Sequence, residues 1–187
     1  MRVGRLQRFS KDKAHQRGFT MVELIIVIVI IGILGAVAAS RFFGASSVDG
    51  RTYADQLGAT LRYAQKMAIA QGRNVYARVS ASGVALCYTA DTVCPSVSRV
   101  LAPSGENSRS STTAAGCQND STWACEAPPS GVTVGVSTTF YFDPVGKPFA
   151  SGDAPPTATS SFATLTVPIG GTTVRSVVVE AETGYVH

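Results

Sequence analysis

Apolar and polar positions follow three different patterns along the chain. Nearly every residue from Leu24 to Ser40 is aliphatic or small, and none is charged. Between Arg41 and Gly72, apolar residues recur at steps of three and four, which is typical of a helix with one buried face. This stripe consists of Tyr53, Leu57, Leu61, Ala64 and Ala68. After Gly72, apolar and polar residues alternate, which favours β-strands.

These patterns predict an α+β fold: a long N-terminal helix, apolar in its first half and amphipathic in its second, packed on an antiparallel β-sheet or sandwich. Gly44 and Gly50 flank a Ser-rich stretch that is expected to interrupt the helix, with Asp49 as the N-cap where it resumes. Gly72 is the expected C-terminal stop. The predicted strands are 74–81, 83–89, 131–137, 138–143, 162–169 and 173–181.

The remaining segments of the body predict connections. Residues 181–187 indicate a closing hairpin with Gly184 at its turn. Residues 90–130, rich in Ser, Thr and Ala, are interpreted as an irregular surface excursion, and residues 143–161 as a second long loop. Residues 73–187 are thus the predicted β-rich globular domain.

Charge is concentrated before the apolar run. Residues 1–18 carry six basic side chains against Asp12, whereas the rest of the chain holds ten basic and eleven acidic side chains. A basic segment directly before an apolar run predicts a cytoplasmic leader. The run of seventeen residues extends about 26 Å as a helix, and with Phe19–Val22 it approaches a hydrocarbon core of roughly 30 Å. We therefore expect residues 19–40 to span the inner membrane once.

Three interpretations fit this N-terminus. A secretory signal fits the basic start and the small residues at 36–40, but its apolar region is normally only about 7–15 residues long. A plain membrane anchor fits the length but leaves Glu23 unexplained, because an acid at membrane depth costs at least about 2.5 kcal/mol. Cleavage after Gly18 explains both features, because it creates an α-amino group on Phe19 one helical turn from Glu23.

Such an amine would pair with Glu23, either in the same chain or in a neighbour. A paired acid in a low dielectric is far less costly than an unpaired one. If many copies pack their apolar helices side by side, each Glu23 neutralises a neighbouring Phe19 amine and sets the axial register. The acid is then an assembly device.

The stretch RGFTMVELIIVIVIIGILGAVA resembles the class III signal of type IV prepilins and type II secretion pseudopilins. Gly18, Phe19, Thr20 and Glu23 match that pattern. The resemblance implies that an inner-membrane prepilin peptidase cleaves after Gly18 and methylates Phe19, and that Glu23 acts in assembly. Ser40 departs from the pattern, since many major pilins have a kinking Pro there; Gly32, Gly35 and Gly44 are alternative bending points.

The body is similar to the GspH/FimT class of minor pilins and pseudopilins, on the segment FYFDPVGKP and the closing TGYV. Within that class, residues 40–72 look closest to minor pilins of mannose-sensitive haemagglutinin-type pili. The resemblance implies a structural subunit that is anchored in membrane lipid and then assembles with major and minor pilins at an inner-membrane platform, in a priming or tip complex. A type II secretion pseudopilin remains the first alternative.

The four cysteines, Cys87, Cys94, Cys117 and Cys125, lie beyond the apolar run. An even number in an exported segment indicates disulfides and an oxidising compartment. Three connectivities are possible, and we favour the sequence-local pairs 87–94 and 117–125. Their spacings do not fit the usual zinc patterns, so no metal is expected.

Catalysis finds little support in the sequence. The only His after the leader is the terminal His187, and no H-E-x-x-H, Walker or G-x-S-x-G motif occurs. Neither catalytic residues nor a cofactor are expected, and an anchored enzyme is the third alternative. Asp143, before Pro144, predicts turn initiation. Trp123 is either a packing anchor for the stapled loop or an exposed contact at a filament tip.

A filament-displayed adhesin or DNA receptor is the other alternative. DNA binding would need cations gathered on one face, because phosphate contacts supply most of the affinity. The basic residues of the body are dispersed along the sequence: Arg73, Arg78, Arg99, Arg109, Lys147 and Arg175. This pattern alone gives no sign of such a face.

Overall fold

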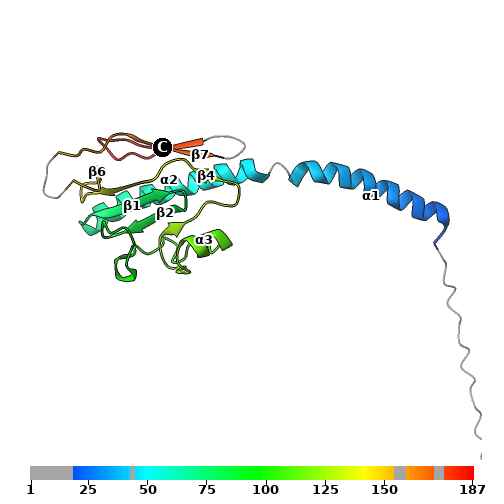
Figure 1. Ribbon diagram of the computed structural model, residues 1–187, viewed down its shortest axis with the longest axis horizontal. Coiled ribbons are helices and arrows are strands. Elements are labelled where there is room, and N and C mark those ends of the chain that lie inside the picture. The colour runs from blue at the N-terminus through cyan, green and yellow to red at the C-terminus, as the bar shows by residue number, and fades with distance from the viewer. Residues whose placement is uncertain (1–18, 43–44, 154–158, 171–174) are drawn as a thin grey trace, which may run out of the picture. The chain divides into compact units, whose positions relative to one another are not determined.

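The computed structural model describes residues 19–42, 45–153, 159–170 and 175–187 (Figure 1). By its internal contacts the chain forms two compact units, Met1–Phe43 and Gly44–His187, and each is described by itself. The predicted leader, residues 1–18, lies outside the described residues, as do residues 154–158 of the second predicted loop.

The first unit contains one helix, α1, from Met21 to Phe42. Its sequence holds no Pro, so every residue after the first turn can donate to the preceding turn. The two glycines, Gly32 and Gly35, lie within the helix and do not end it.

The second unit begins with helix α2, from Ala45 to Gln71. The predicted N-cap at Asp49 is wrong, because the backbone is already helical four residues earlier; the Thr52 hydroxyl donates to the Val48 carbonyl within this turn. The predicted stop at Gly72 is confirmed. Gly72 has φ +61°. Its N–H donates to Ile69 O and the N–H of Arg73 to Ala68 O, which is a Schellman motif.

Two antiparallel sheets follow. The larger has the order β3-β2-β1-β5-β6 and the smaller the order β4-β7-β8. The strands of the larger sheet are β1 (Val75–Ser80), β2 (Gly83–Cys87), β3 (Cys125–Glu126), β5 (Thr138–Phe142) and β6 (Pro148–Ala150). Those of the smaller are β4 (Thr133–Val134), β7 (Leu165–Gly170) and β8 (Arg175–Val179).

The core lies between α2 and both sheets. The helix packs against β1 and β2 of the larger sheet and against β7 and β8 of the smaller (Figure 1). All five residues of the predicted stripe are buried, and so are the alternate residues of β1 that face the helix: Val75, Ala77 and Val79. The α+β prediction and the buried stripe are therefore confirmed.

The predicted strand 131–137 is observed only at Thr133–Val134. The next residue, Gly135, donates its N–H to the carbonyl of Pro168 on β7 at 2.9 Å. Pro168 has no N–H to return a bond, so the ladder ends at this point. The prediction missed this because the interrupting residue lies on the partner strand.

The segment 90–130 is more ordered than predicted. It contains a 3₁₀ turn, η1 (Ser96–Ser98), a short helix, α3 (Ser111–Gly116), and the edge strand β3. Ser110 caps α3, accepting the N–H of Thr113 at 3.1 Å. The closing hairpin is confirmed: Val179 bridges to Val186, and Gly184 has φ +66°.

Candidate functional site

Helix α1 begins with a side-chain cap. The Oγ1 of Thr20 accepts the backbone N–H of Glu23 at 3.3 Å, and the carbonyl of Thr20 accepts the N–H of Leu24 at 3.2 Å. Thr20 is therefore the N-cap and Glu23 the third helical residue, the spacing of a capping box. The sequence carries this signal as T-x-x-E, a local pattern that was not among the predictions.

The start of the helix bears on the expected pairing of Phe19 with Glu23. In the uncleaved chain Phe19 lies before the helix begins at Met21, so helical spacing does not set its distance from Glu23. The pairing expected after cleavage stays a prediction. Gly18, the predicted cleavage position, lies outside the described residues. Glu23 itself sits at the positive end of the helix dipole, where a carboxylate is favourable.

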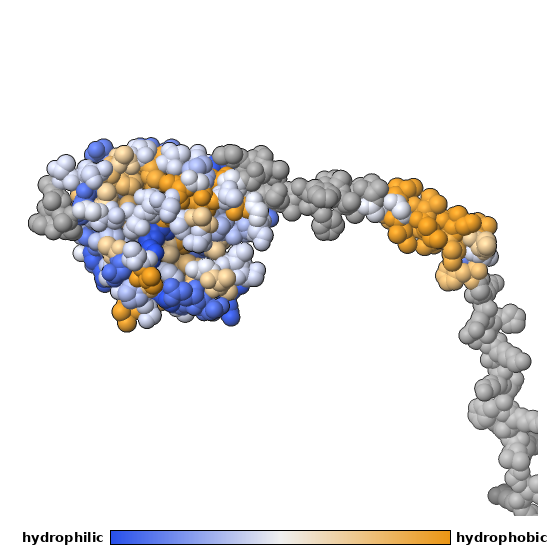
Figure 2. Space-filling view, in the orientation of Figure 1, coloured by the Kyte–Doolittle hydropathy of each residue, from blue (hydrophilic) through white to orange (hydrophobic). Residues whose placement is uncertain are grey.

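The described surface of α1 is apolar on every side. Its large side chains from Met21 to Leu34 are 45–83% exposed, and Figure 2 shows them as a continuous hydrophobic stretch. A helix that is apolar all round needs an apolar environment. Among the helices of the described residues, none meets the length and hydropathy required to cross a membrane.

Disulfides join Cys87 to Cys94 and Cys117 to Cys125, the sequence-local pairing. All four cysteines are buried in one cluster with Trp123. The indole of Trp123 is 3% exposed and donates to the Leu86 carbonyl at 2.8 Å. Trp123 is thus a packing anchor, and its interpretation as an exposed contact is wrong.

Arg99 lies on this cluster. Its guanidinium is 4.6 Å from the centre of the Trp123 ring and forms a 2.7 Å ion pair with Asp120. Hydrogen bonds from the Thr122 side chain and from Arg99 lower the pKa of Asp120. The contact fastens segment 96–99 to the loop at 117–125.

A buried acid that the sequence did not single out lies beside the second disulfide. Glu126 is 8% exposed, and its carboxylate accepts the N–H and hydroxyl of Ser108, both at 2.6 Å, and the hydroxyl of Thr113 at 3.0 Å. Burial, and secondarily the charge of Glu126, raise the pKa of Tyr53. The partners of Glu126 lie 13 to 73 residues away from it in the sequence, so no local pattern signals them.

The other charged residues serve local structure. Asp143 Oδ1 accepts the N–H groups of Val145 and Lys147, so the predicted turn initiation is confirmed. The dispersed cations have separate partners: Arg109 pairs with Glu106, Lys147 with Glu182, and Arg73 lies over the Tyr88 ring. Within the part of the chain that the structure describes, no group of His, Cys, Asp and Glu side chains is arranged to hold a metal.

The features of the N-terminus agree with comparisons to known proteins. The prokaryotic N-terminal methylation motif matches residues 13–39. Over 59 residues the chain is 41% identical to the type IV narrow pilus major component PilA5 of Thermus thermophilus. This match covers 32% of the chain and 51% of that protein, so the chain spans about half the length of the relative. No solved structure matches the chain. Residues 13–39 thus carry the prokaryotic N-terminal methylation motif, and part of the chain is similar to a component of a type IV pilus.

Proposed function

We propose that this protein is a structural minor pilin that assembles into a type IV pilus through its N-terminal helix. It is made as a prepilin, cleaved after Gly18 by a prepilin peptidase and methylated on the new amine of Phe19. The observation that carries the proposal is the methylation motif at residues 13–39, which includes the proposed cleavage site and most of α1. The similarity to PilA5, a major component of a type IV narrow pilus, supports assembly into a pilus, whereas the minor role rests on the resemblance of the body given below.

The driving force for assembly is packing of α1 against the apolar helices of neighbouring subunits, with Glu23 paired to an amine. The apolar side chains of α1 are exposed on all faces in the single chain, and removing apolar surface from water yields about 25 cal/mol per Å², so the helix stays in apolar surroundings throughout. Membrane lipid covers them before assembly and neighbouring helices cover them in the filament. The exchange costs little, because both surroundings are apolar.

Glu23 then has two consecutive roles. In the uncleaved chain its backbone N–H is capped by Thr20, and its charge is favourable at the helix N-terminus. After cleavage, the Phe19 amine of its own chain or of a neighbour provides a cation. In the filament this pair fixes the axial register of each subunit.

The proposed topology is a single pass through the inner membrane. The uncharged sequence from Leu24 to Ser40, preceded by Phe19–Val22, supports a span, and the basic leader supports a cytoplasmic start. Residues 73–187 form the periplasmic domain in this topology. The periplasm is oxidising, so the two disulfides are stable there. The inner-membrane assembly platform then moves the subunit from the membrane into the filament.

The minor role, in a priming or tip complex, follows from the resemblance of the body to the GspH/FimT class. A type II secretion pseudopilin is the second candidate, because the same kind of N-terminal signal and helix occurs in type IV prepilins and in pseudopilins. The copy number separates a minor from a major subunit. Quantitative mass spectrometry of sheared filaments should find far fewer copies of this chain than of the major pilin, and immunogold labelling should lie at filament ends.

Processing is tested by mass spectrometry of the protein isolated from membranes and filaments. The expected mature chain begins at Phe19 and carries one methyl group on its amine. A strain without the prepilin peptidase is the control and should retain residues 1–18. A native terminus at Ser40 would instead indicate secretory processing and contradict the proposal.

A further inference from the structure

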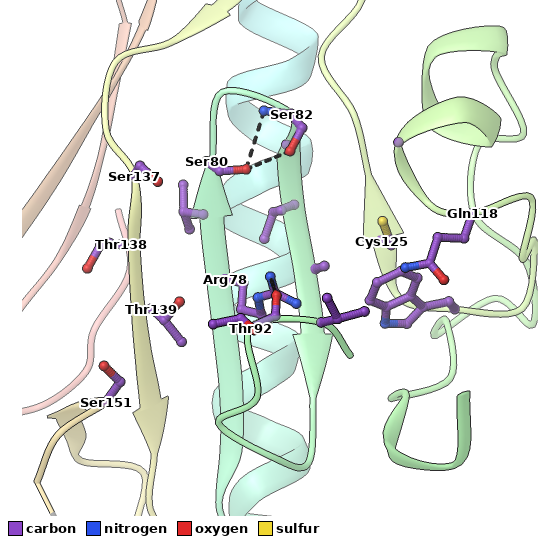
Figure 3. Close-up of a pocket in the computed structure, with 17 residues that line it drawn as sticks. Arg78, Ser80, Ser82, Thr92, Gln118, Cys125, Ser137, Thr138, Thr139 and Ser151 are labelled. Atoms are coloured by element: carbon purple, nitrogen blue, oxygen red, sulfur yellow. Dashed lines mark hydrogen bonds between the residues drawn. The ribbon is translucent and has the colours of Figure 1, made fainter. Parts of the chain in front are cut away.

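A groove of about 450 Å³ crosses the outer face of the larger sheet, on the side of β1, β2 and β5 away from α2 (Figure 3). Its volume is within the range of small-molecule sites in proteins. The groove belongs to the globular unit, and the proposed assembly function does not use it.

The strand register explains why the face is hollow here. Residues opposite one another on paired strands lie on the same face of a sheet. At one end the facing residues are Tyr76 and Tyr141, whose rings are 5.0 Å apart, and Tyr141 also stacks on Phe149. Two residues further along, Arg78 faces Thr139. The change from aromatic to short polar side chains leaves the space open.

Each disulfide holds one loop at the groove. The loop closed by Cys87–Cys94 contributes Thr92 and Val93, and the loop closed by Cys117–Cys125 contributes Gln118. The guanidinium of Arg78 donates to the Thr92 carbonyl, which ties the first loop to the sheet. The walls are therefore covalently fixed before any ligand arrives, which reduces the entropy cost of binding.

The lining is rich in hydroxyl groups and carries one charge. Ser80 and Ser82 lie at the β1–β2 turn, above Arg78 in the view, and the residues of β5 and its approach lie to the left of it (Figure 3). Thr139 lies opposite Arg78 on the outer face, and Ser137, two residues before it, lies on the same side. Thr138, in contrast, lies opposite Val79 on the face toward α2. Of the residues that line the groove, Arg78 has the only formal charge, and it forms no ion pair with any described residue.

We propose that this groove binds a saccharide that carries a carboxylate, such as a uronic acid. Hydroxyl side chains both donate and accept, so a row of them matches the hydroxyls of a sugar ring. The planar guanidinium of Arg78 matches a carboxylate in a bidentate arrangement. Val93, 63% exposed at the rim, offers an apolar contact to the C–H face of the ring.

The test uses the full mature chain in lipid nanodiscs and saturation-transfer difference NMR with glucuronate as the probe. Wild-type protein should transfer saturation to the sugar protons, and empty nanodiscs should not. Arg78→Gln should weaken binding by about tenfold or more, because it removes a charge-assisted hydrogen bond. Thr139→Val, which replaces one hydroxyl by a methyl group of similar size, should weaken it by several-fold.

Matched substitutions elsewhere are the controls. Arg51→Gln on α2 and Thr166→Val on β7 change exposed residues of the same types and should leave binding unchanged. Thermal unfolding of each variant verifies its fold, and if Arg78→Gln does not fold, Thr139→Val decides the question. Equal binding of glucose and glucuronate would overturn the role of Arg78. Displacement of glucuronate by equimolar acetate, or no binding of glucuronate, would overturn the saccharide site. All these experiments measure sugar binding and not filament assembly. A negative result would therefore contradict the saccharide site without contradicting the proposed assembly function.

Discussion

The hydroxyl of Thr20 accepts the backbone N–H of Glu23 at 3.3 Å and so caps the apolar helix α1. Only the backbone of Glu23 takes part in this contact, but its side chain stands at the third helical position, where a capping box has Glu or Gln, and so has a candidate structural role besides the assembly role proposed for its charge. A capping box tolerates Glu or Gln at the third helical position, whereas pairing with an amine requires the charge. The two roles are therefore separable by substitution.

We predict that Glu23→Gln assembles as poorly as Glu23→Ala. Gln has a side-chain amide that suits a capping box, but it carries no charge. Breaking a buried ion pair costs about 3–5 kcal/mol. Filament incorporation, measured by immunoblotting of sheared filaments, should fall at least about tenfold for both variants. Both should remain in the membrane fraction.

Thr20→Val provides the matched control for the cap. It removes the accepting hydroxyl at a cost of about 1 kcal/mol and leaves the charge of Glu23 in place, so incorporation should fall only slightly. If Glu23→Gln assembles normally while Glu23→Ala and Thr20→Val fail, capping explains the acid and the pairing mechanism is wrong.

Gln65 connects α2 to two turns of the body. Its Nε2 donates to the carbonyls of Gly146 at 2.8 Å and Thr183 at 2.9 Å. Gln65→Ala leaves both acceptors without this donor, and we expect a loss of about 1–3 kcal/mol in the free energy of unfolding. Urea unfolding of residues 45–187 measures it. Gln71→Ala, at an exposed position of the same helix, should change stability by less than about 0.5 kcal/mol, and an equal effect of both would contradict the role of Gln65.

The disulfides should each stabilise the globular unit by about 2.5 kcal/mol, the value that loop-closure entropy gives for loops of this length. Replacing Cys87 and Cys94 together by Ser, or Cys117 and Cys125 together, tests each one. Both bridges share one buried cluster with Trp123. The loss in unfolding free energy when all four cysteines are replaced should therefore differ from the sum of the two separate losses. Near-ultraviolet circular dichroism of Trp123 should report the loosened cluster, and additive losses would contradict the coupling.

Much of the fold follows from local sequence patterns. The stripe at Tyr53, Leu57 and Leu61 is buried as predicted, since helical periodicity records a buried face directly. Gly72 ends α2 because the stop needs a positive φ, which glycine adopts without strain. The disulfide pairing also follows chain proximity, as short loops close at the lowest entropy cost.

What the sequence did not predict depends on contacts between distant segments. Strand β4 ends early because of Pro168 on its partner, and the carboxylate of Glu126 accepts hydrogen bonds from Ser108, 18 residues before it in the sequence. The groove around Arg78 needs the register of three strands and both disulfide loops. The cap at Thr20 is the exception: its signal was local and was overlooked.

The pairing of Arg99 with Asp120 should make stability depend on acid pH. Hydrogen bonds from Thr122 and Arg99 lower the pKa of Asp120 in the folded protein. A lowered pKa contributes stability that is present above the unfolded value of about 3.9 and is lost as the pH falls through the folded value. Asp120→Asn should therefore unfold in less urea than wild type at pH 7, and the difference should shrink as the pH falls below about 4.

Asp91→Asn is the control for this prediction, because it removes the same charge from an exposed position. Its midpoint in urea should stay close to that of wild type at pH 7. The free energy lost in Asp120→Asn should be about 1–3 kcal/mol, the range for a hydrogen bond to a charged group that lies partly buried. A difference between wild type and Asp120→Asn that is the same at pH 7 and pH 3 would show that the carboxylate charge does not hold Arg99, and that its contacts with Trp123 and Gln118 hold it instead.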